Sequence, residues 1–154
     1  MLFLLFQLGN DRYAIDAGQV AEILPSLHFK RIPHSPLGVA GVFNYHGTPV
    51  PLIDLTYLAL GRPSQAKMST RIILINHSDE SGSKHLLGVI AEHVMENMQR
   101  AESDFGDSGV ATAEAPYLGS VTTDRNGIIQ RIEVRNLLPA SLWAQLFCEL
   151  VEPV

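Results

Sequence analysis

The sequence contains a single cysteine, Cys148, among its 154 residues. One cysteine excludes an intramolecular disulfide and a cysteine-based zinc site, and its place in an amphipathic segment favours a small core side chain over a nucleophile. The six histidines are scattered singly, with no HExxH motif and no helical i, i+4 pair. Such a distribution is typical of turn and surface histidines rather than of a metal site. We therefore expect no metal and no cofactor.

Basic residues are fewer than acidic ones, with 11 Lys and Arg against 16 Asp and Glu and a net charge of −5. Nucleic acids and anionic membranes bind clustered Lys and Arg, so neither is an expected partner. The apolar run at residues 1–6 is much shorter than the roughly 18 residues that span a bilayer, and no basic segment or cleavage site marks a signal peptide. We expect one globular cytoplasmic domain over residues 1–154, without direct membrane insertion.

Short β-branched and aromatic runs separated by turn residues recur along the chain, which is typical of an all-β fold. Turns are predicted at 9–11, 46–49 and 124–127, and the last contains Asn-Gly, the strongest short hairpin signal. The expected strands are 3–8, 13–15, 39–45, 50–55, 71–76, 85–90 and 128–134. Many short strands with frequent turns favour a barrel-like β protein.

Two segments have helical rather than strand spacing. Between Asp16, placed as a helix N-cap, and Pro25, the apolar residues follow a helical period. In residues 139–150, three leucines lie four positions apart with two aromatic residues beside them. We expect a short helix at 16–25 and an amphipathic C-terminal helix at 139–150.

An internal repeat is the most informative pattern in the chain. The repeated positions are Ile15, Val20 and Glu22 with Val89, Val94 and Glu96 (offset 74), Ile53-Asp54-Leu55 and Leu58 with Ile132-Glu133-Val134 and Leu137 (offset 79), and Gly41 with Gly119 (offset 78). The near-constant offset predicts a duplicated β unit, with subdomains at about 1–65 and 66–138. Units of roughly 70 residues are marginal alone, so they should share a core, and C-terminal elements could return to the first subdomain.

The sequence motifs of common catalytic sites are absent from the chain. The chain has no GxxxxGKS/T, GxGxxG or GxSxG sequence, which removes the usual phosphate-binding loops and nucleophile elbows. Asp54 and Glu133 are the only carboxylates inside apolar strand-like runs. They could act as the acid and base of a hydrolase only if they met in one open pocket. Their matching places in the repeat favour a structural role at two strand ends, so we expect no enzyme.

Three segments resemble the core signature of the CheW-like domain, which runs roughly RIP-N-P, then GV-NLRG, then a strand of the form P-(I/V)-DL. The matching segments are Arg31-Ile32-Pro33-His34-Ser35-Pro36, Gly41-Val42-Phe43-Asn44-Tyr45-His46-Gly47 and Val50-Pro51-Leu52-Ile53-Asp54-Leu55. Upstream, Tyr13-Ala14-Ile15 and Val20-Ala21-Glu22-Ile23 resemble the family's opening, and Gly88-Val89-Ile90-Ala91-Glu92-His93-Val94 and Tyr117-Leu118-Gly119 resemble its second half. The resemblance covers about residues 3–138, and the combination of motifs is highly specific.

The resemblance implies a mainly β fold of two SH3-like five-stranded barrels related by an internal repeat, with a few short helices and a C-terminal helix. It also implies a non-catalytic adaptor in bacterial chemosensory arrays. Such a protein couples the cytoplasmic tips of methyl-accepting chemoreceptors to the regulatory domain of a CheA-type histidine kinase. An alternative is a CheW-like protein that links receptors laterally without contacting the kinase.

By motif position, the partner-contacting places of the family fall on Val20, Glu22, His46, Arg71, Ile72 and Val94. Apolar side chains there would supply buried area, and the charged side chains would fix the register of the partner. Val20 and Val94 could equally serve core packing.

Three positions depart from the family's pattern. The turn arginine of NLRG is His46 here, so a permanent charge is replaced by a side chain that is mostly neutral at pH 7. Glu92 stands at the family's second-half Asp, and Glu133 stands at its final acidic strand position. We hypothesise a divergent member that serves a specialised signalling system with its own receptor and kinase, such as the Wsp-type surface-sensing pathway that drives cyclic-di-GMP synthesis.

Overall fold

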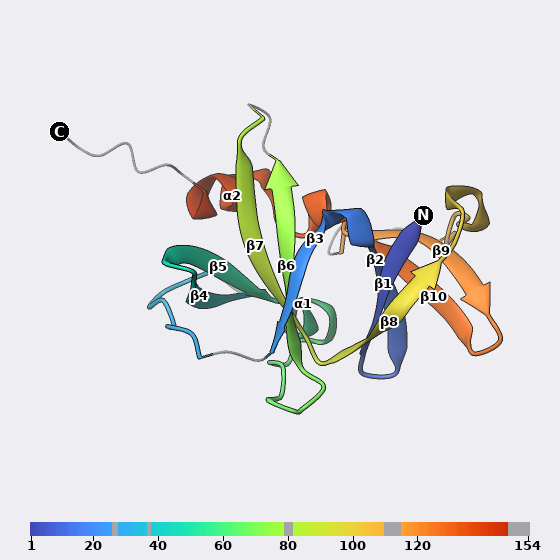
Figure 1. The fold of residues 1–154 in the computed structure, drawn as a ribbon, viewed down its shortest axis with the longest axis horizontal. Coiled ribbons are helices and arrows are strands. Elements are labelled where there is room, and N and C mark those ends of the chain that lie inside the picture. The colour runs from blue at the N-terminus through green and yellow to red at the C-terminus, as the bar shows by residue number, and fades with distance from the viewer. Residues whose placement is uncertain (26–27, 37, 79–81, 110–114, 148–154) are drawn as a thin grey trace.

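The structure is a computed structural model that describes residues 1–25, 28–36, 38–78, 82–109 and 115–147. Ten strands and five short helical segments follow one another along these residues (Figure 1). The strands are β1 (Leu2–Leu8), β2 (Asp11–Asp16), β3 (Val20–Pro25), β4 (Val39–Tyr45), β5 (Thr48–Asp54), β6 (Arg71–Ser78), β7 (Lys84–Ala91), β8 (His93–Gln99), β9 (Leu118–Asp124) and β10 (Gly127–Ile132). The helical segments are η1 (Ala17–Gln19), α1 (Leu55–Leu60), η2 (Glu102–Asp104), η3 (Val134–Asn136) and α2 (Ala140–Leu146).

The strands form two five-stranded sheets. Sheet A has the order β8-β1-β2-β10-β9, and sheet B has the order β3-β6-β7-β5-β4. Figure 1 shows sheet A on the right and sheet B on the left. The chain passes from sheet A to sheet B before β3 and returns to sheet A before β8. This mainly β fold of two small barrels is the predicted fold class, and each predicted strand overlaps an observed one. No helix in the described ranges is long and apolar enough to cross a membrane.

Each sheet curls until the chain leaving one edge strand meets the opposite edge. In sheet B, Lys30 follows edge strand β3 and forms a bridge with Val42 on edge strand β4. In sheet A, Gly106 follows β8 and bridges Val121 on β9 in the same way. Val121 lies 79 residues after Val42, so the two barrels close at equivalent places.

The repeat is present in the topology, but the sheets do not follow the predicted division of the chain at residue 65. Sheet A combines β1 and β2 of the first unit with β8, β9 and β10 of the second, and sheet B combines β6 and β7 with β3, β4 and β5. The two units have therefore exchanged strands. Each barrel takes its first two strands from one unit and its last three from the other.

The pairing registers are also equivalent in the two sheets. Val20 lies opposite Ile75 in sheet B, and the repeat-related Val94 lies opposite Phe6 in sheet A. A register shift follows each of these pairs, as expected for a β-bulge. The parallel pairs also have equivalent registers. Leu52 lies opposite Gly88 in sheet B, and the repeat-related residues Arg131 and Ala14 lie opposite each other in sheet A. The offsets found in the sequence thus relate positions of the same structural role.

The largest core is shared by both sheets. It contains Leu4, Phe6 and Ile15 of sheet A together with Ile73 and Val89 of sheet B, all of them buried. Two smaller clusters lie within the individual barrels, one in sheet B around Phe43 and Leu52 and one in sheet A around Phe3 and Ile129. A shared core explains how two small units can be stable together.

The helix predicted at 16–25 is wrong. Asp16 does accept a hydrogen bond from the Gly18 N–H at 2.9 Å, but the helical turn that it caps ends at Gln19. Residues 20–25 form β3 because they pair with residues 71–75 of β6. Tertiary pairing has overridden the local helical spacing.

The C-terminal helix is confirmed as α2, from Ala140 to Leu146. Leu142 is buried in the shared core, and the indole of Trp143 stacks on the His77 ring of the β6–β7 hairpin at 4.0 Å. The helix thus packs against sheet B although it follows the last strand of sheet A. Residues 148–150 of the predicted helix lie outside the described residues.

We predict that Gly88→Ala destabilises the fold by about 1–3 kcal/mol through overpacking. A Cβ at Gly88 would lie 2.7 Å from the Leu52 side chain and 2.8 Å from Phe43, at the parallel joint between β5 and β7. Urea unfolding measures the effect. Gly106→Ala is the control, since a Cβ there would meet nothing within 4 Å. Equal unfolding midpoints for the two variants would contradict this prediction.

Candidate partner-binding surface

The six residues assigned by the resemblance lie on both sheets. They are Val20 and Glu22 on β3, His46 in the β4–β5 turn, Arg71 and Ile72 at the start of β6, and Val94 at the start of β8. Five of them therefore belong to sheet B, and Val94 belongs to sheet A.

Glu22 and His46 meet through Tyr45, and we call these three residues the turn cluster. The Tyr45 hydroxyl donates a hydrogen bond to Glu22 Oε2 at 2.6 Å, and the His46 ring lies edge-on to the Tyr45 ring at 4.4 Å. The pKa of Tyr45 is raised, chiefly by this hydrogen bond, because the phenolate would face a carboxylate. His46 has a φ of +50°, a left-handed conformation that turns the chain from β4 into β5.

Arg71 and Ile72 lie apart from the turn cluster. Arg71 is opposite Pro25, at the far end of the β3–β6 pair from Val20, and its guanidinium donates to the carbonyls of Met68 and Thr70. Ile72 is only 2% exposed and belongs to the core of sheet B. Its side chain is therefore part of the barrel interior and lies outside the surface that a partner can reach.

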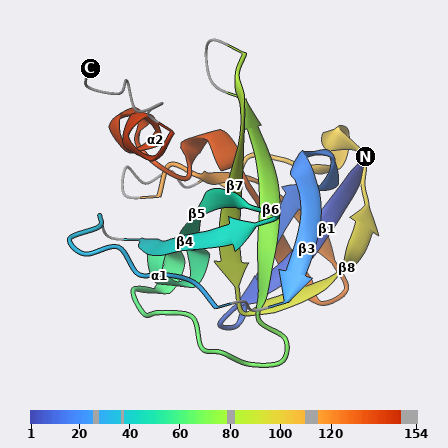
Figure 2. The same cartoon turned by 60° about the vertical axis from the view of Figure 1, so that its left-hand side comes forward.

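Val20 is the first residue of β3 and Val94 is the second residue of β8, and both strands are edge strands. Both valines are half-buried and pack against the shared core. The residues that follow them are exposed and form what we call the edge surface. It consists of Ala21, Glu22 and Ile23 on β3 and of Met95, Glu96 and Asn97 on β8. In Figure 2 the strands β3 and β8 flank β1.

The edge surface combines apolar and acidic side chains. Ile23 is 42% exposed and Met95 is 39% exposed, and each lies beside a repeat-related glutamate, Glu22 or Glu96. β3 and β8 are paired on one side only, so each presents an unpaired edge next to these side chains. Such an edge can accept a strand or pack against a helix of another protein.

The sequence reasoning missed Tyr45 and Glu96 as site residues. Tyr45 lies inside the quoted motif, but its link to Glu22 depends on the curling of sheet B, for which the sequence gives no signal. For Glu96 a signal existed, since the 74-residue offset relates it to Glu22.

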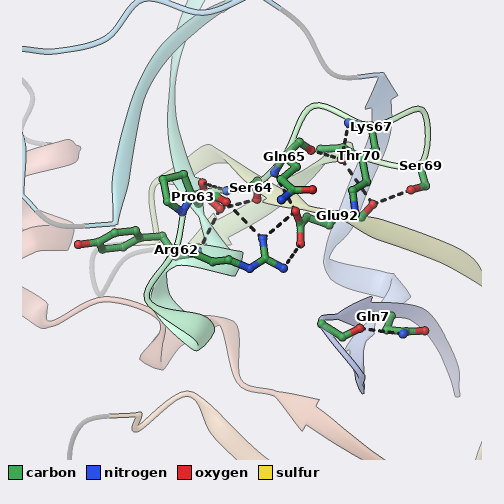
Figure 3. A network of polar contacts seen from close by, with 12 residues as sticks. Gln7, Arg62, Pro63, Ser64, Gln65, Lys67, Ser69, Thr70 and Glu92 are labelled. Atoms are coloured by element: carbon green, nitrogen blue, oxygen red, sulfur yellow. Dashed lines mark hydrogen bonds and ion pairs between the residues drawn. The ribbon is translucent and has the colours of Figure 1, made fainter.

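A buried carboxylate fixes the loop between α1 and β6, as Figure 3 shows. Glu92 is 5% exposed and accepts hydrogen bonds from the Arg62 guanidinium at 2.8 and 3.0 Å and from the Gln65 N–H at 2.7 Å. The Arg62 hydrogen bond is the main reason why the pKa of Glu92 lies below its ordinary value, and it outweighs the opposing effect of burial. The loop next to Arg71 is thus held in one conformation.

Asp54 and Glu133 do not form one catalytic pocket. Asp54 ends β5 in sheet B, and its carboxylate accepts hydrogen bonds from the Tyr57 N–H and from the N–H and hydroxyl of Ser64. Glu133 follows β10 in sheet A and lies 3.7 Å from the Arg131 guanidinium. The two carboxylates occupy equivalent strand ends in separate barrels, which contradicts the hydrolase alternative. Within the described ranges, no group of three His, Cys, Asp or Glu side chains could hold a metal ion.

Two barrels that exchange strands, share a core and leave repeat-related strands at their edges define the class of duplicated β-barrel proteins. The chain belongs to the CheW-like domain family, which matches residues 2–141. It is 32% identical over 78 residues to the chemotaxis protein CheW of Helicobacter pylori, an alignment that covers 51% of this chain and 47% of that protein. It is also 32% identical over 92 residues to the chemotaxis protein CheW of Klebsiella aerogenes, covering 60% of this chain and 52% of that protein.

The chain thus spans about half the length of the curated relatives it matches. The crystal structure of the scaffolding protein TtCheW from Thermoanaerobacter tengcongensis has the same fold, with a TM-score of 0.73 at 21% identity. The match covers 86% of this chain and 84% of that one. The predicted family and the predicted fold of two SH3-like barrels are both confirmed.

We predict that Glu92→Gln lowers the free energy of unfolding at pH 7 by about 1.5–3 kcal/mol, because it weakens charge-assisted hydrogen bonds to a buried group. Because the pKa of Glu92 is lower in the folded protein, its ionised carboxylate stabilises the fold at pH values above the ordinary pKa of 4.5. This stabilisation is lost as the pH falls through the pKa of Glu92 in the folded state. The difference between the native protein and the variant should therefore narrow below about pH 4.5.

Denaturant unfolding between pH 3 and 7 measures this narrowing, within the range where carboxylates titrate. Glu102→Gln is the matched control, since Glu102 is largely exposed and pairs with Arg131 at the surface. Its effect should stay within about 0.5 kcal/mol. A Glu92→Gln deficit that does not change with pH would argue against a role for the Glu92 charge.

Proposed function

We propose that the protein is a cytoplasmic adaptor that couples the tips of methyl-accepting chemoreceptors to the regulatory domain of a CheA-type histidine kinase. Membership of the CheW-like domain family and the fold shared with a scaffolding protein support this function. The observation that carries the proposal is the edge surface, where two repeat-related strands expose apolar and acidic side chains on both sheets.

An adaptor that holds two proteins at once needs two separate areas of contact. The turn cluster lies on sheet B, and Glu96 with Met95 lies on β8 of sheet A. The β4–β5 turn also borders an open cavity of about 600 Å³, lined by Lys30, Phe43 and Asn44 among others. A concave area beside an aromatic side chain suits anchoring of a partner residue. We assign the turn cluster to one partner and the β8 part of the edge surface to the other.

The first test is isothermal titration of the protein with the kinase regulatory domain, alone and with a receptor-tip fragment. We expect saturable one-to-one binding in the micromolar range, about −8 kcal/mol. Tyr45→Ala and Glu96→Arg should each weaken binding of one partner by about tenfold while sparing the other. Asp11→Arg, an equal charge change at an exposed position outside both areas, should leave both affinities unchanged.

Binding to the receptor tip without binding to the kinase would favour a lateral receptor-linking protein instead. The replacement of the family's arginine by His46 is the feature that points in that direction, because it removes a five-donor fork from the turn. No binding to either partner would contradict the coupling function.

We predict that His46→Arg leaves binding to the cognate kinase and receptor unchanged or weaker. The specialised system that we hypothesised, of which the Wsp-type pathway is an example, would have partners adapted to a histidine beside Tyr45. Titration of both partners with the variant measures this. A clear gain in affinity would argue against specialisation.

A further inference from the structure

A second cavity lies on sheet B between two loops. Its volume is about 410 Å³, and it is bordered by the β3–β4 connection on one side and by the loop after α1 on the other. Figure 2 shows both segments passing α1. Ile90 and Val39 contribute apolar atoms from the sheet, Phe29 and Arg31 come from the first loop, and Gln65 from the second.

The loops around this cavity are strongly basic in a chain of net negative charge. Residues 28–40 and 61–71 contain no Asp or Glu. Their basic residues are Lys30, Arg31, Arg62, Lys67 and Arg71. Basic residues with no acidic residue between them in the sequence attract acidic partners and repel basic ones.

The neighbouring carboxylates compensate part of this charge. Glu92 pairs with Arg62, and the nearby Lys67 charge also contributes to lowering the pKa of Glu92. Asp54 borders the cavity, but its carboxylate accepts hydrogen bonds from Ser64 and Tyr57. Arg71 donates to the backbone carbonyls of Met68 and Thr70, and the guanidinium of Arg31 lies over the Phe29 ring at 5.8 Å. Among the described residues, no carboxylate pairs with any cation of these loops other than Arg62.

Apolar side chains are exposed on the same two loops. Met68, which is 94% exposed, lies between the lining residues Ala66 and Thr70 in the sequence, and the exposed Ile32 follows Arg31. The second loop is also pre-organised, because Glu92 and Asp54 hold Gln65 and Ser64 in place. A rigid cavity with apolar atoms from the sheet loses little entropy on binding, and the cations of the two loops favour an acidic occupant.

We propose that this cavity is a docking site for an acidic segment of a protein partner, which inserts one apolar side chain between the loops and places carboxylates on Arg31 and Lys67. The site is separate from the edge surface and the turn cluster, and it does not depend on the coupling function. Nucleic acid is a poorer fit, because phosphates and sugars would leave the apolar interior unfilled.

The probe for the test is a fluorescent peptide of about ten residues, rich in Glu and with one central Phe, as in short-motif recognition. Fluorescence anisotropy with the full chain should show saturable binding that weakens with added salt. Replacing the Phe by Ser in the peptide, or its Glu residues by Lys, should reduce the affinity at least tenfold. A single-stranded oligonucleotide of equal charge should bind more weakly than the peptide.

Protein variants locate the site. Ala66→Trp, which fills the cavity from an exposed position, and Arg31→Glu should each weaken peptide binding by about tenfold or more. Arg125→Glu in the β9–β10 turn is the control with the same charge change and should have no effect. Circular dichroism verifies that each variant is folded.

Several outcomes would overturn the proposal. Absence of peptide binding, equal binding of the Phe and Ser peptides, or full binding to Ala66→Trp would each exclude an apolar anchor in the cavity. Tighter binding of the oligonucleotide than of the peptide would indicate that the site binds nucleic acid and not an acidic protein segment. The variants that test the coupling function, Tyr45→Ala and Glu96→Arg, lie outside this cavity, so failure here would leave the coupling function standing.

Discussion

The structure depends on the pairing of strands from one repeat unit with strands from the other. In each barrel a parallel pair joins the units, β2 with β10 in sheet A and β7 with β5 in sheet B. Parallel strands need long connections, and the chain supplies them by crossing between the sheets after Asp16 and again after Ala91. Neither unit can close a barrel alone. The shared core and the exposed edges of β3 and β8 both follow from this exchange.

The same crossings determine where partners can bind. β3 and β8 begin immediately after the chain leaves one sheet, so each becomes an edge strand of the other sheet. Their half-buried valines, Val20 and Val94, fill the shared core, while the next residues turn outward after the bulge. A β-bulge re-aims side chains and interrupts pairing, which keeps a free edge from aggregating. The duplicated fold thus presents two similar but chemically distinct surfaces, one with Ile23 and one with Met95.

The buried carboxylates Asp54 and Glu92 stabilise the loop after α1, and Lys30 and Arg31 on the facing loop remain available for other contacts. Asp54 and Glu92 each satisfy several donors of the loop after α1. Among the described residues, the ion pair that these carboxylates form with the loop cations is the one between Glu92 and Arg62. The result is a partly apolar cavity between two basic loops on a chain of net negative charge.

The sequence by itself determined seven of the ten strands in the described residues, the C-terminal helix, the repeat and the family, but neither β3 nor β8 nor β9. β-branched runs, turn residues and a constant offset are local or pairwise signals, and they need no knowledge of the third dimension. Only the tertiary structure decided which unit each strand joins, because the repeat is equally compatible with separate and with exchanged barrels. It also made residues 20–25 a strand, buried Ile72 and joined Tyr45 to Glu22. These features depend on which distant strands pair and how far the sheet curls, and local spacing carries no information on either.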